Sequence, residues 1–375
     1  MLKKIFYFIV LVLFVFSCFP SDVQKLPGSS KYSVAAEVYG PLEVIANITL
    51  DKEPLCVAVN DETNRVYVGV EEGLVVLNGE TYEVVTTVPM DDDVVVLAIN
   101  PETNRVFAGL YNGDVAAIDG SSNLKLGEIP HINYNYRQYW LAVNPVTNLV
   151  YICDYASFQG EYDSVMVYSG EDFTFVTAVN IPGSDSHSFV EHVGVAVNPE
   201  TNRVYATWSG DNTLHLIDGD THEIIDSVSP SSFSETVMVN SYTNYVYVGD
   251  AVLDGETLEE VSSNYYGVLK EIDPVSNVLY TTLYEEIFAL NGSTHAVLDS
   301  LEVSWWISSY SDLVAVNSKT SKIYMANDVD SEVEVLIPES PVWMCMALAL
   351  FVIVVAVSVY KQNHTRSTSK FARAL

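Results

Sequence analysis

The sequence predicts an all-β fold, a seven-bladed β-propeller of four-stranded antiparallel blades. Valine, isoleucine and tyrosine, which favour strands, recur in short alternating runs. A phrase like VAVNPETNRVY from Val195 occurs seven times, and successive copies lie 33 to 54 residues apart. Strand-like repeats with a period near forty residues are typical of propellers. The polar residues that anchor the copies are Asn60, Asn100, Asn144, Asn198, Asn240, Asp273 and Asn317.

Each repeat predicts four strands, which we name a to d. In the phrase itself, strand a ends in an asparagine whose side chain can hydrogen-bond to the backbone two residues further on. A second asparagine, such as Asn64, tolerates a left-handed backbone before strand b. A glycine turn then joins strands c and d, because Asn-Gly or Asp-Gly between apolar runs favours a hairpin. These turns begin at Asn78, Asp119, Ser169, Asp218, Asp254 and Asn291.

The repeats resemble the YVTN family of β-propeller repeats. The resemblance rests on the phrase VAVNPETNRVYAT from Val195 together with the turn IDGDT from Ile217, and it covers residues 34–337. The family is known from archaeal surface-layer proteins and related bacterial proteins. The resemblance therefore implies a propeller in an archaeal envelope.

The seventh repeat lacks a fourth strand of its own. Its third strand is expected at Glu332 to Ile337, and no glycine turn follows. A strand-like segment without a partner, Leu42 to Leu50, precedes the first repeat. We expect it to complete the last blade, since this pairing removes an open sheet edge. The alternative is an eighth, partial blade from residues 32–50, which leaves two exposed edges.

The N-terminus predicts export. Residues 1–21 are expected to form a signal peptide, because two lysines precede a short apolar run. Cleavage after Ser17 fits the small residue there. The sequence around Cys18 also approximates a lipidation motif, so a lipid on this cysteine is an alternative.

The C-terminus predicts one membrane span. Residues 342–360 carry no charge, and at about 1.5 Å per residue they reach across a bilayer core of about 30 Å. The basic tail, 361–375, should remain in the cytoplasm, which places the propeller, residues 32–337, outside the cell membrane. Processing near the Pro-Glu-Ser-Pro sequence from Pro338 is an alternative to a plain anchor.

The charge of the chain excludes nucleic acid as a partner. The sequence holds 17 basic and 49 acidic residues, a net charge of −32. Six of the basic residues and no acidic residue lie in 1–21 and 361–375, so the part between them carries −38. Phosphate binding needs clustered lysine and arginine. We interpret the acidic surface as a solvated one that favours solubility.

Cysteines and sequons give two smaller predictions. Cys56 and Cys153 lie in different predicted blades, so we expect buried thiols and no disulfide framework. N-glycosylation sequons predict glycans at Asn47 and Asn291. Asn363 should stay unmodified if the tail is cytoplasmic.

The expected contact surface lies on one face of the propeller. In an up-and-down blade the a–b and c–d turns share one face, and the variable b–c and d–a loops share the other, where binding residues are usually found. The variable loops are rich in aromatic residues, which suit an extracellular protein or glycan partner. An alternative is that these rings wedge between blades. The candidates are Tyr134, Tyr136, Arg137, Tyr139, Trp140, Tyr265, Tyr266, Trp305, Trp306 and Tyr310.

Catalysis and metal binding have weaker support. The best metal ligands are His187, Glu191 and His192, and supporting ligands from other blades are not evident. Two acidic runs, at 91–93 and 328–332, do not match a complete calcium loop. No nucleophile motif or phosphate loop occurs, and we expect no cofactor.

The sequence therefore predicts a membrane-anchored binding or structural module at the cell surface. The predicted topology turns the uniform face toward the bilayer and the variable face outward. The alternative is an extracytoplasmic enzyme, lactonase-like or metal-dependent, with its site at the mouth of the central channel.

Overall fold

The computed structural model describes residues 40–130, 141–154, 164–181, 193–208, 212–232, 236–263, 265–305, 307 and 313–338. It also describes two short paired strands, β1 (Gln24–Lys25) and β2 (Tyr32–Ser33). The chain divides into two units, of which Leu42–Ile337 is one. This unit contains all of the larger sheets.

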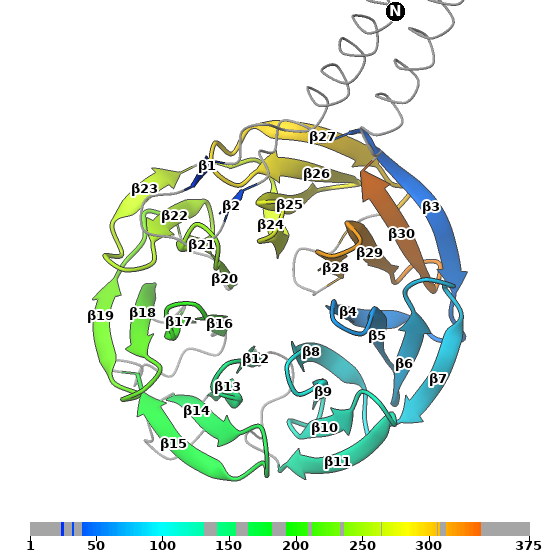
Figure 1. Cartoon of the computed structure of the whole chain (residues 1–375), viewed down its shortest axis with the longest axis horizontal. Helices are drawn as coiled ribbons and strands as arrows, with labels where there is room; N and C mark the ends of the chain where they lie inside the picture. Colours follow the sequence, from blue (N-terminus) through cyan, green and yellow to red (C-terminus); the bar gives the residue numbers. More distant parts are fainter. Residues whose placement is uncertain are drawn as a thin grey trace, which may run out of the picture. The chain divides into compact units, whose positions relative to one another are not determined.

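Seven four-stranded antiparallel sheets form a ring, as the repeats predict (Figure 1). The inner strands are buried along most of their length, since neighbouring blades cover both of their faces. Blade one consists of β4 (Pro54–Asn60), β5 (Arg65–Val70), β6 (Gly73–Asn78) and β7 (Val84–Pro89). Blade two consists of β8 (Val94–Asn100), β9 (Arg105–Leu110), β10 (Val115–Asp119) and β11 (Leu124–Ile129). Blade three consists of β12 (Leu141–Asn144), β13 (Leu149–Asp154), β14 (Ser164–Ser169) and β15 (Phe175–Asn180).

Blades four to six repeat this order, from the channel outward. Blade four consists of β16 (Val193–Asn198), β17 (Arg203–Trp208), β18 (Thr213–Asp218) and β19 (Ile224–Val228). Blade five consists of β20 (Val237–Asn240), β21 (Tyr245–Val248), β22 (Ala251–Asp254) and β23 (Glu260–Ser263). Blade six consists of β24 (Val268–Asp273), β25 (Val278–Leu283), β26 (Glu286–Asn291) and β27 (Val297–Glu302).

The seventh blade joins the two ends of the propeller sequence. It consists of β28 (Val314–Asn317), β29 (Lys322–Asn327), β30 (Glu332–Pro338) and, as its outer strand, β3 (Leu42–Thr49). Figure 1 shows β3 outside β30. The closure predicted from the unpartnered strand is confirmed, and an eighth blade does not form in the described residues.

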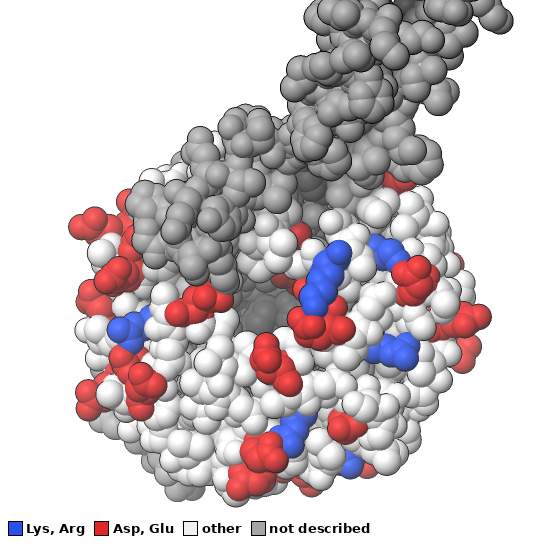
Figure 2. Space-filling view, viewed as in Figure 1, with Lys and Arg blue, Asp and Glu red and all other residues white. Residues whose placement is uncertain are grey.

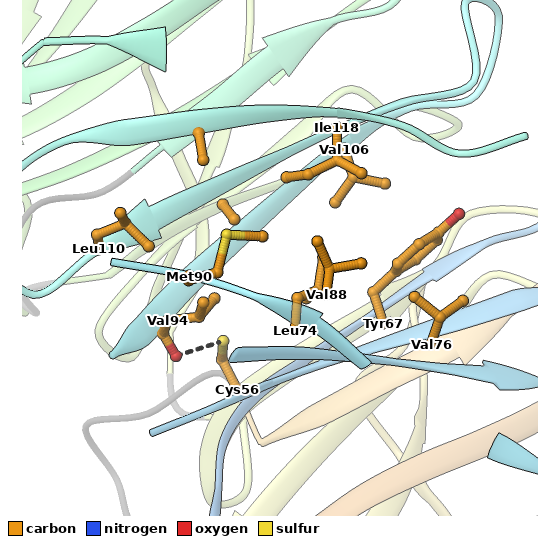
Figure 3. Packing of buried hydrophobic residues seen from close by; sticks show 12 residues of the cluster. Cys56, Tyr67, Leu74, Val76, Val88, Met90, Val94, Val106, Leu110 and Ile118 are labelled. Carbon is orange, nitrogen blue, oxygen red and sulfur yellow. Dashed lines mark hydrogen bonds between the residues drawn. The ribbon is translucent and has the colours of Figure 1, made fainter. Parts of the chain in front are cut away.

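The hydrophobic core lies between neighbouring blades. Figure 3 shows the cluster between blades one and two, where Tyr67 and Leu74 of the first blade pack against Val106 and Ile118 of the second. All four of these side chains are fully buried, and full burial of one Leu or Val stabilises the fold by about 1.5–3 kcal/mol. Each blade therefore depends on its neighbours for a core, which explains why the array closes.

The thiol prediction is confirmed. Cys56 and Cys153 are buried thiols in different blades. The Sγ of Cys56 lies 3.5 Å from the carbonyl oxygen of Val94, so this thiol fills space at a blade junction (Figure 3).

Candidate functional site

The turns of the propeller separate onto two rims. The a–b and c–d turns of one blade lie together, because the glycine N–H of the second turn donates to a carbonyl of the first. We name this end of the strands the uniform rim. The b–c turns and the connections between blades form the variable rim at the other end. The uniform-rim bonds, 2.7–3.0 Å long, join Gly79 to Asn64, Gly120 to Asn104, Gly170 to Asn148, Gly219 to Asn202, Gly255 to Asn244 and Gly292 to Asn277.

A ring of side-chain amides joins neighbouring blades on the uniform rim. The first asparagine of every phrase but the sixth, which has Asp273, is buried and uses both ends of its amide. In Asn60, Oδ1 accepts the N–H of Glu62 at 3.0 Å within its own turn, while Nδ2 donates to Asn104 of the next blade at 2.9 Å. Equivalent bonds between blades, 2.7–3.0 Å long, join Asn100 to Asn148, Asn144 to Asn202, Asn198 to Asn244, Asn240 to Asn277 and Asn317 to Asn64.

The accepting asparagines all have a left-handed backbone, with φ between 51° and 60°. Asparagine tolerates this conformation better than most residues. This conformation ends the turn and also directs the asparagine side chain toward the preceding blade. The repeated phrase therefore specifies contact between blades, a role that the sequence reasoning assigned to turns alone.

Close approach explains the glycine of each c–d turn. A Cβ at Gly219 would lie 2.3 Å from Oδ1 of Asn202. The positive-φ glycines of the described residues lie elsewhere, and the left-handed residue of this turn is His222, with φ 56°. The hairpin forms as predicted, but its turn is longer than the two-residue loop that Asn-Gly usually signals.

At some junctions the tyrosine of strand b adds a third contact between blades. The hydroxyl of Tyr205 donates to the carbonyl oxygen of Gly255 in the next blade at 2.7 Å, and Tyr324 bonds Gly79 in the same way at 3.2 Å. Burial raises the pKa of both phenols, so they remain neutral donors. The uniform rim is thus a set of repeated structural bonds.

The variable rim holds the described part of the predicted contact set. Tyr265, Tyr266 and Trp305 belong to the described residues. The other candidates lie outside them, and their role stays a prediction. These candidates are Tyr134, Tyr136, Arg137, Tyr139, Trp140, Trp306 and Tyr310.

Tyr265 and Trp305 pack between blades. Tyr265 is 7% exposed and meets the ring of Tyr247 edge-on, with centroids 5.8 Å apart. Trp305 is 3% exposed, and its Nε1–H donates to Oε1 of Glu334 at 2.8 Å. These two rings occupy the wedge positions that the sequence analysis gave as the alternative to surface contact.

Two tyrosines of blade six are exposed on the variable rim. Tyr266 is 48% exposed and rests edge-on against Phe288, with centroids 4.7 Å apart. Tyr284 is 64% exposed, has φ 58°, and lies in the turn between β25 and β26. Its carbonyl oxygen accepts the N–H of Ile307 at 3.1 Å, which holds the turn in place. The sequence reasoning missed Tyr284 because it searched the connections between blades and not this short hairpin.

Blade six also exposes carboxylates at its variable-rim end. Glu285 and Glu302 are exposed on the same blade. Between Arg203 and Lys319 the sequence has one basic residue, Lys270, which is buried. We name Tyr266, Tyr284, Glu285 and Glu302 the blade-six patch. Its rings and carboxylates can stack on and hydrogen-bond to a polar partner, or attract a cationic one.

Acidic side chains are also widespread elsewhere on the ring. Figure 2 shows them spread around the face in view, with few basic ones between them. This distribution agrees with the excess of acids in the sequence. It gives a field that repels anions from the described surface.

The described carboxylates do not assemble a metal centre. Within the described ranges no group of three or more histidine, cysteine, aspartate or glutamate side chains is arranged to hold a metal ion. In the acidic run at 91–93, Asp91 approaches Lys125 at 3.2 Å, whereas Asp93 accepts the N–H of Glu72 at 3.1 Å. The candidate ligands His187, Glu191 and His192 lie outside the described residues.

The two outer sequons differ in their surroundings. Asn47 is exposed on the outer strand β3. Asn291 is half-buried, and its Oδ1 accepts the N–H groups of Ser293 and Thr294, each at 2.9 Å. Both glycans remain predictions.

The structure describes no membrane segment. Over the described ranges, no helix has the length and apolar character needed to cross a bilayer. The predicted signal peptide, span and tail, at 1–21, 342–360 and 361–375, lie outside those ranges.

Comparison with known proteins identifies the architecture. The chain is similar to the crystal structure of the Cps50 (Swd1) β-propeller domain of Myceliophteria thermophila, with a TM-score of 0.63 and 12% identity, over 79% of this chain and 99% of that chain. At this identity the likeness shows the fold. The chain is a seven-bladed β-propeller that resembles a WD40-type propeller. No protein-family model and no curated protein matches it.

Proposed function

We propose that this protein is a cell-surface propeller that binds an extracellular protein or glycan through its variable rim. In this proposal, residues 342–360 anchor the chain, and the repeats are of the YVTN type that they resemble. Since β30 ends at the uniform rim, a short link to the anchor would turn that rim toward the membrane. The variable rim would then face outward.

The blade-six patch is the observation that carries the proposal. Loops on a rigid scaffold are the usual place for binding residues. Here the scaffold is held by repeated bonds on one rim, while Tyr266 and Tyr284 expose their rings on the other. Tyrosine is enriched in binding sites because it offers a large rigid surface with a polar end. A structural role alone does not require such exposed rings.

Binding can be tested with the full-length protein in lipid nanodiscs. A glycan array and a set of purified envelope proteins serve as probes, and affinity is measured for each hit. We expect Tyr284→Ala to weaken binding at least about tenfold, as loss of an interface tyrosine often does. Tyr266→Ala should act in the same direction.

A matched control lies on the opposite rim of the same blade. Val275 is 65% exposed, close to the 64% of Tyr284. Val275→Ala should leave affinity unchanged, and both variants should keep the wild-type unfolding midpoint. Equal losses in the two variants, or no loss in either tyrosine variant, would reject the blade-six patch as the binding site.

Location can be tested separately from binding. Val329, on the variable rim, is 68% exposed, and the native thiols Cys56 and Cys153 are buried. In a Cys18→Ser background, a Val329→Cys variant in intact cells should react with a membrane-impermeant maleimide, while the Cys18→Ser parent should not. Labelling of the variant only after lysis would contradict a surface location.

A further inference from the structure

One junction of the ring lacks the amide bond. At the junction of blades six and seven, Asp273 takes the donor's place and Ser321, with a left-handed φ of 56°, takes the acceptor's. A carboxylate has no N–H to donate. The oxygens of Asp273 instead accept bonds within their own turn, from Val275 N–H at 2.9 Å and Ser276 Oγ–H at 2.6 Å.

The same junction lacks a c–d turn on its blade-seven side. The outer strand of blade seven is β3, from the start of the propeller, so no glycine turn joins β30 to it. The chain enters this blade at Leu42 and leaves it at Pro338, both at the uniform rim.

Negative charges on both neighbours of blade seven further weaken the contacts of its a–b turn. Asp61 of blade one accepts the N–H of Ser318, in the a–b turn of blade seven, at 3.2 Å. Burial, with a smaller contribution from the charge of Asp273, raises the pKa of Asp61 to about 6. The nearby Lys319 opposes this shift and also pairs with Glu62 at 2.5 Å. At neutral pH, Asp61 and Asp273 therefore repel each other across this turn.

Some of the bonds that span the junction lie at other positions. Leu42 N–H donates to Oδ2 of Asp299 at 2.5 Å, which ties the outer strands of the two blades together. Trp305, from the connection that follows β27, donates to Glu334 of β30 at 2.8 Å. Neither bond replaces the inner contact between the a–b turns on the uniform rim.

We propose that the junction between blades six and seven is the seam at which the propeller ring opens. Opening separates the uniform-rim ends of β24 and β28, while the Trp305–Glu334 contact acts as the hinge. Because both flanking segments of the chain join the ring at blade seven, a load on either segment acts first on this seam. Trp305 also lies on the connection that crosses the seam, so opening there alters the variable rim beside the blade-six patch.

Hydrogen exchange on the full-length protein in nanodiscs tests the seam. In the wild type, amides near the uniform-rim ends of β24 and β28 should exchange about tenfold faster than those of β16 and β20, which an amide bond joins. The double variant Asp273→Asn/Ser321→Asn installs the missing donor and acceptor. It should slow exchange in β24 and β28 by about tenfold.

The reciprocal variant is the matched control. Asn198→Asp/Asn244→Ser places the seam residues at the junction of blades four and five, and should speed exchange in β16 and β20 by about the same factor. If this variant does not fold, the result from Asp273→Asn/Ser321→Asn decides alone. Equal wild-type exchange at the two junctions, or no slowing in that variant, overturns the seam. The measurement needs no ligand, so its outcome is independent of the proposed binding function.

Discussion

The uniform and variable rims lie at opposite ends of the same strands and use their side chains differently. On the uniform rim, Asn198 is fully buried and bonds both its own turn and the next blade. On the variable rim of blade six, Tyr284 is 64% exposed, and its backbone carbonyl oxygen holds the adjoining loop. The comparison teaches that stability and recognition can be separated within one repeat. Substitutions on the uniform rim should therefore change the free energy of unfolding, and substitutions on the variable rim should change partner affinity.

The largest effect is expected from Gly219→Ala on the uniform rim. The new Cβ would lie 2.3 Å from Oδ1 and 2.6 Å from the carbonyl oxygen of Asn202, so the two turns must move apart. We expect a loss of about 3 kcal/mol in the free energy of unfolding, measured by chemical denaturation. Partner affinity should be retained by the folded fraction.

The control for this variant is an exposed residue on the same rim. Val146 is 73% exposed in the a–b turn of blade three. Val146→Ala should change the free energy of unfolding by less than about 0.5 kcal/mol. A similar loss of unfolding free energy in both variants would contradict the role assigned to the close contact at Gly219.

The repeats were enough to predict the scaffold. Seven copies of one phrase gave the number of blades, and the unpaired segment before Asn60 gave the closure through β3. Alternation of strand direction also gave the shared rim of the two turns. These features are local or periodic, so one sequence contains them.

The contacts between blades could not be predicted in the same way. Asn60 bonds Asn104, which is 44 residues away, and no local pattern shows that the two side chains meet. The burial of Tyr265 and Trp305 likewise depends on the space left by neighbouring blades. The exposure of Tyr284 depends on its left-handed position in a tight turn. Such features arise from three-dimensional packing and not from composition.

A smaller effect is expected from Asn198→Ala. The change removes a bond between blades and leaves the backbone N–H of Glu200 and the Oδ1 of Asn244 without their partner. We expect a loss of about 2 kcal/mol in the free energy of unfolding, since two partly buried hydrogen bonds are lost. Asp273→Ala at the seam removes no bond between blades, so its loss should be smaller. A larger loss for Asp273→Ala would contradict the distinction between the seam and the other junctions.

The smallest effect is expected from Asp61→Asn on the uniform rim. The pH dependence of stability should distinguish this carboxylate from a second one on the same rim. The pKa of Asp61 is raised to about 6, chiefly by burial, so its charge destabilises the fold above that pH and the penalty fades as the pH falls toward 4. After allowance for partial exposure, Asp61→Asn should raise the free energy of unfolding at pH 7 by about 1 kcal/mol. The variant and the wild type should converge below pH 4.

Asp218 provides the comparison of opposite sign. Hydrogen bonds from Thr221 N–H and Arg203 lower its pKa to about 2, so its stabilising contribution is present above the ordinary value of 3.8 and is lost as the pH falls through 2. Asp218→Asn should therefore lower stability at pH 7, where Asp61→Asn raises it. Denaturation curves of both variants at pH 7 and pH 4.5 measure the difference. If both substitutions shift stability in the same direction at pH 7, burial does not control Asp61, and the repulsion inferred beside the seam loses its support.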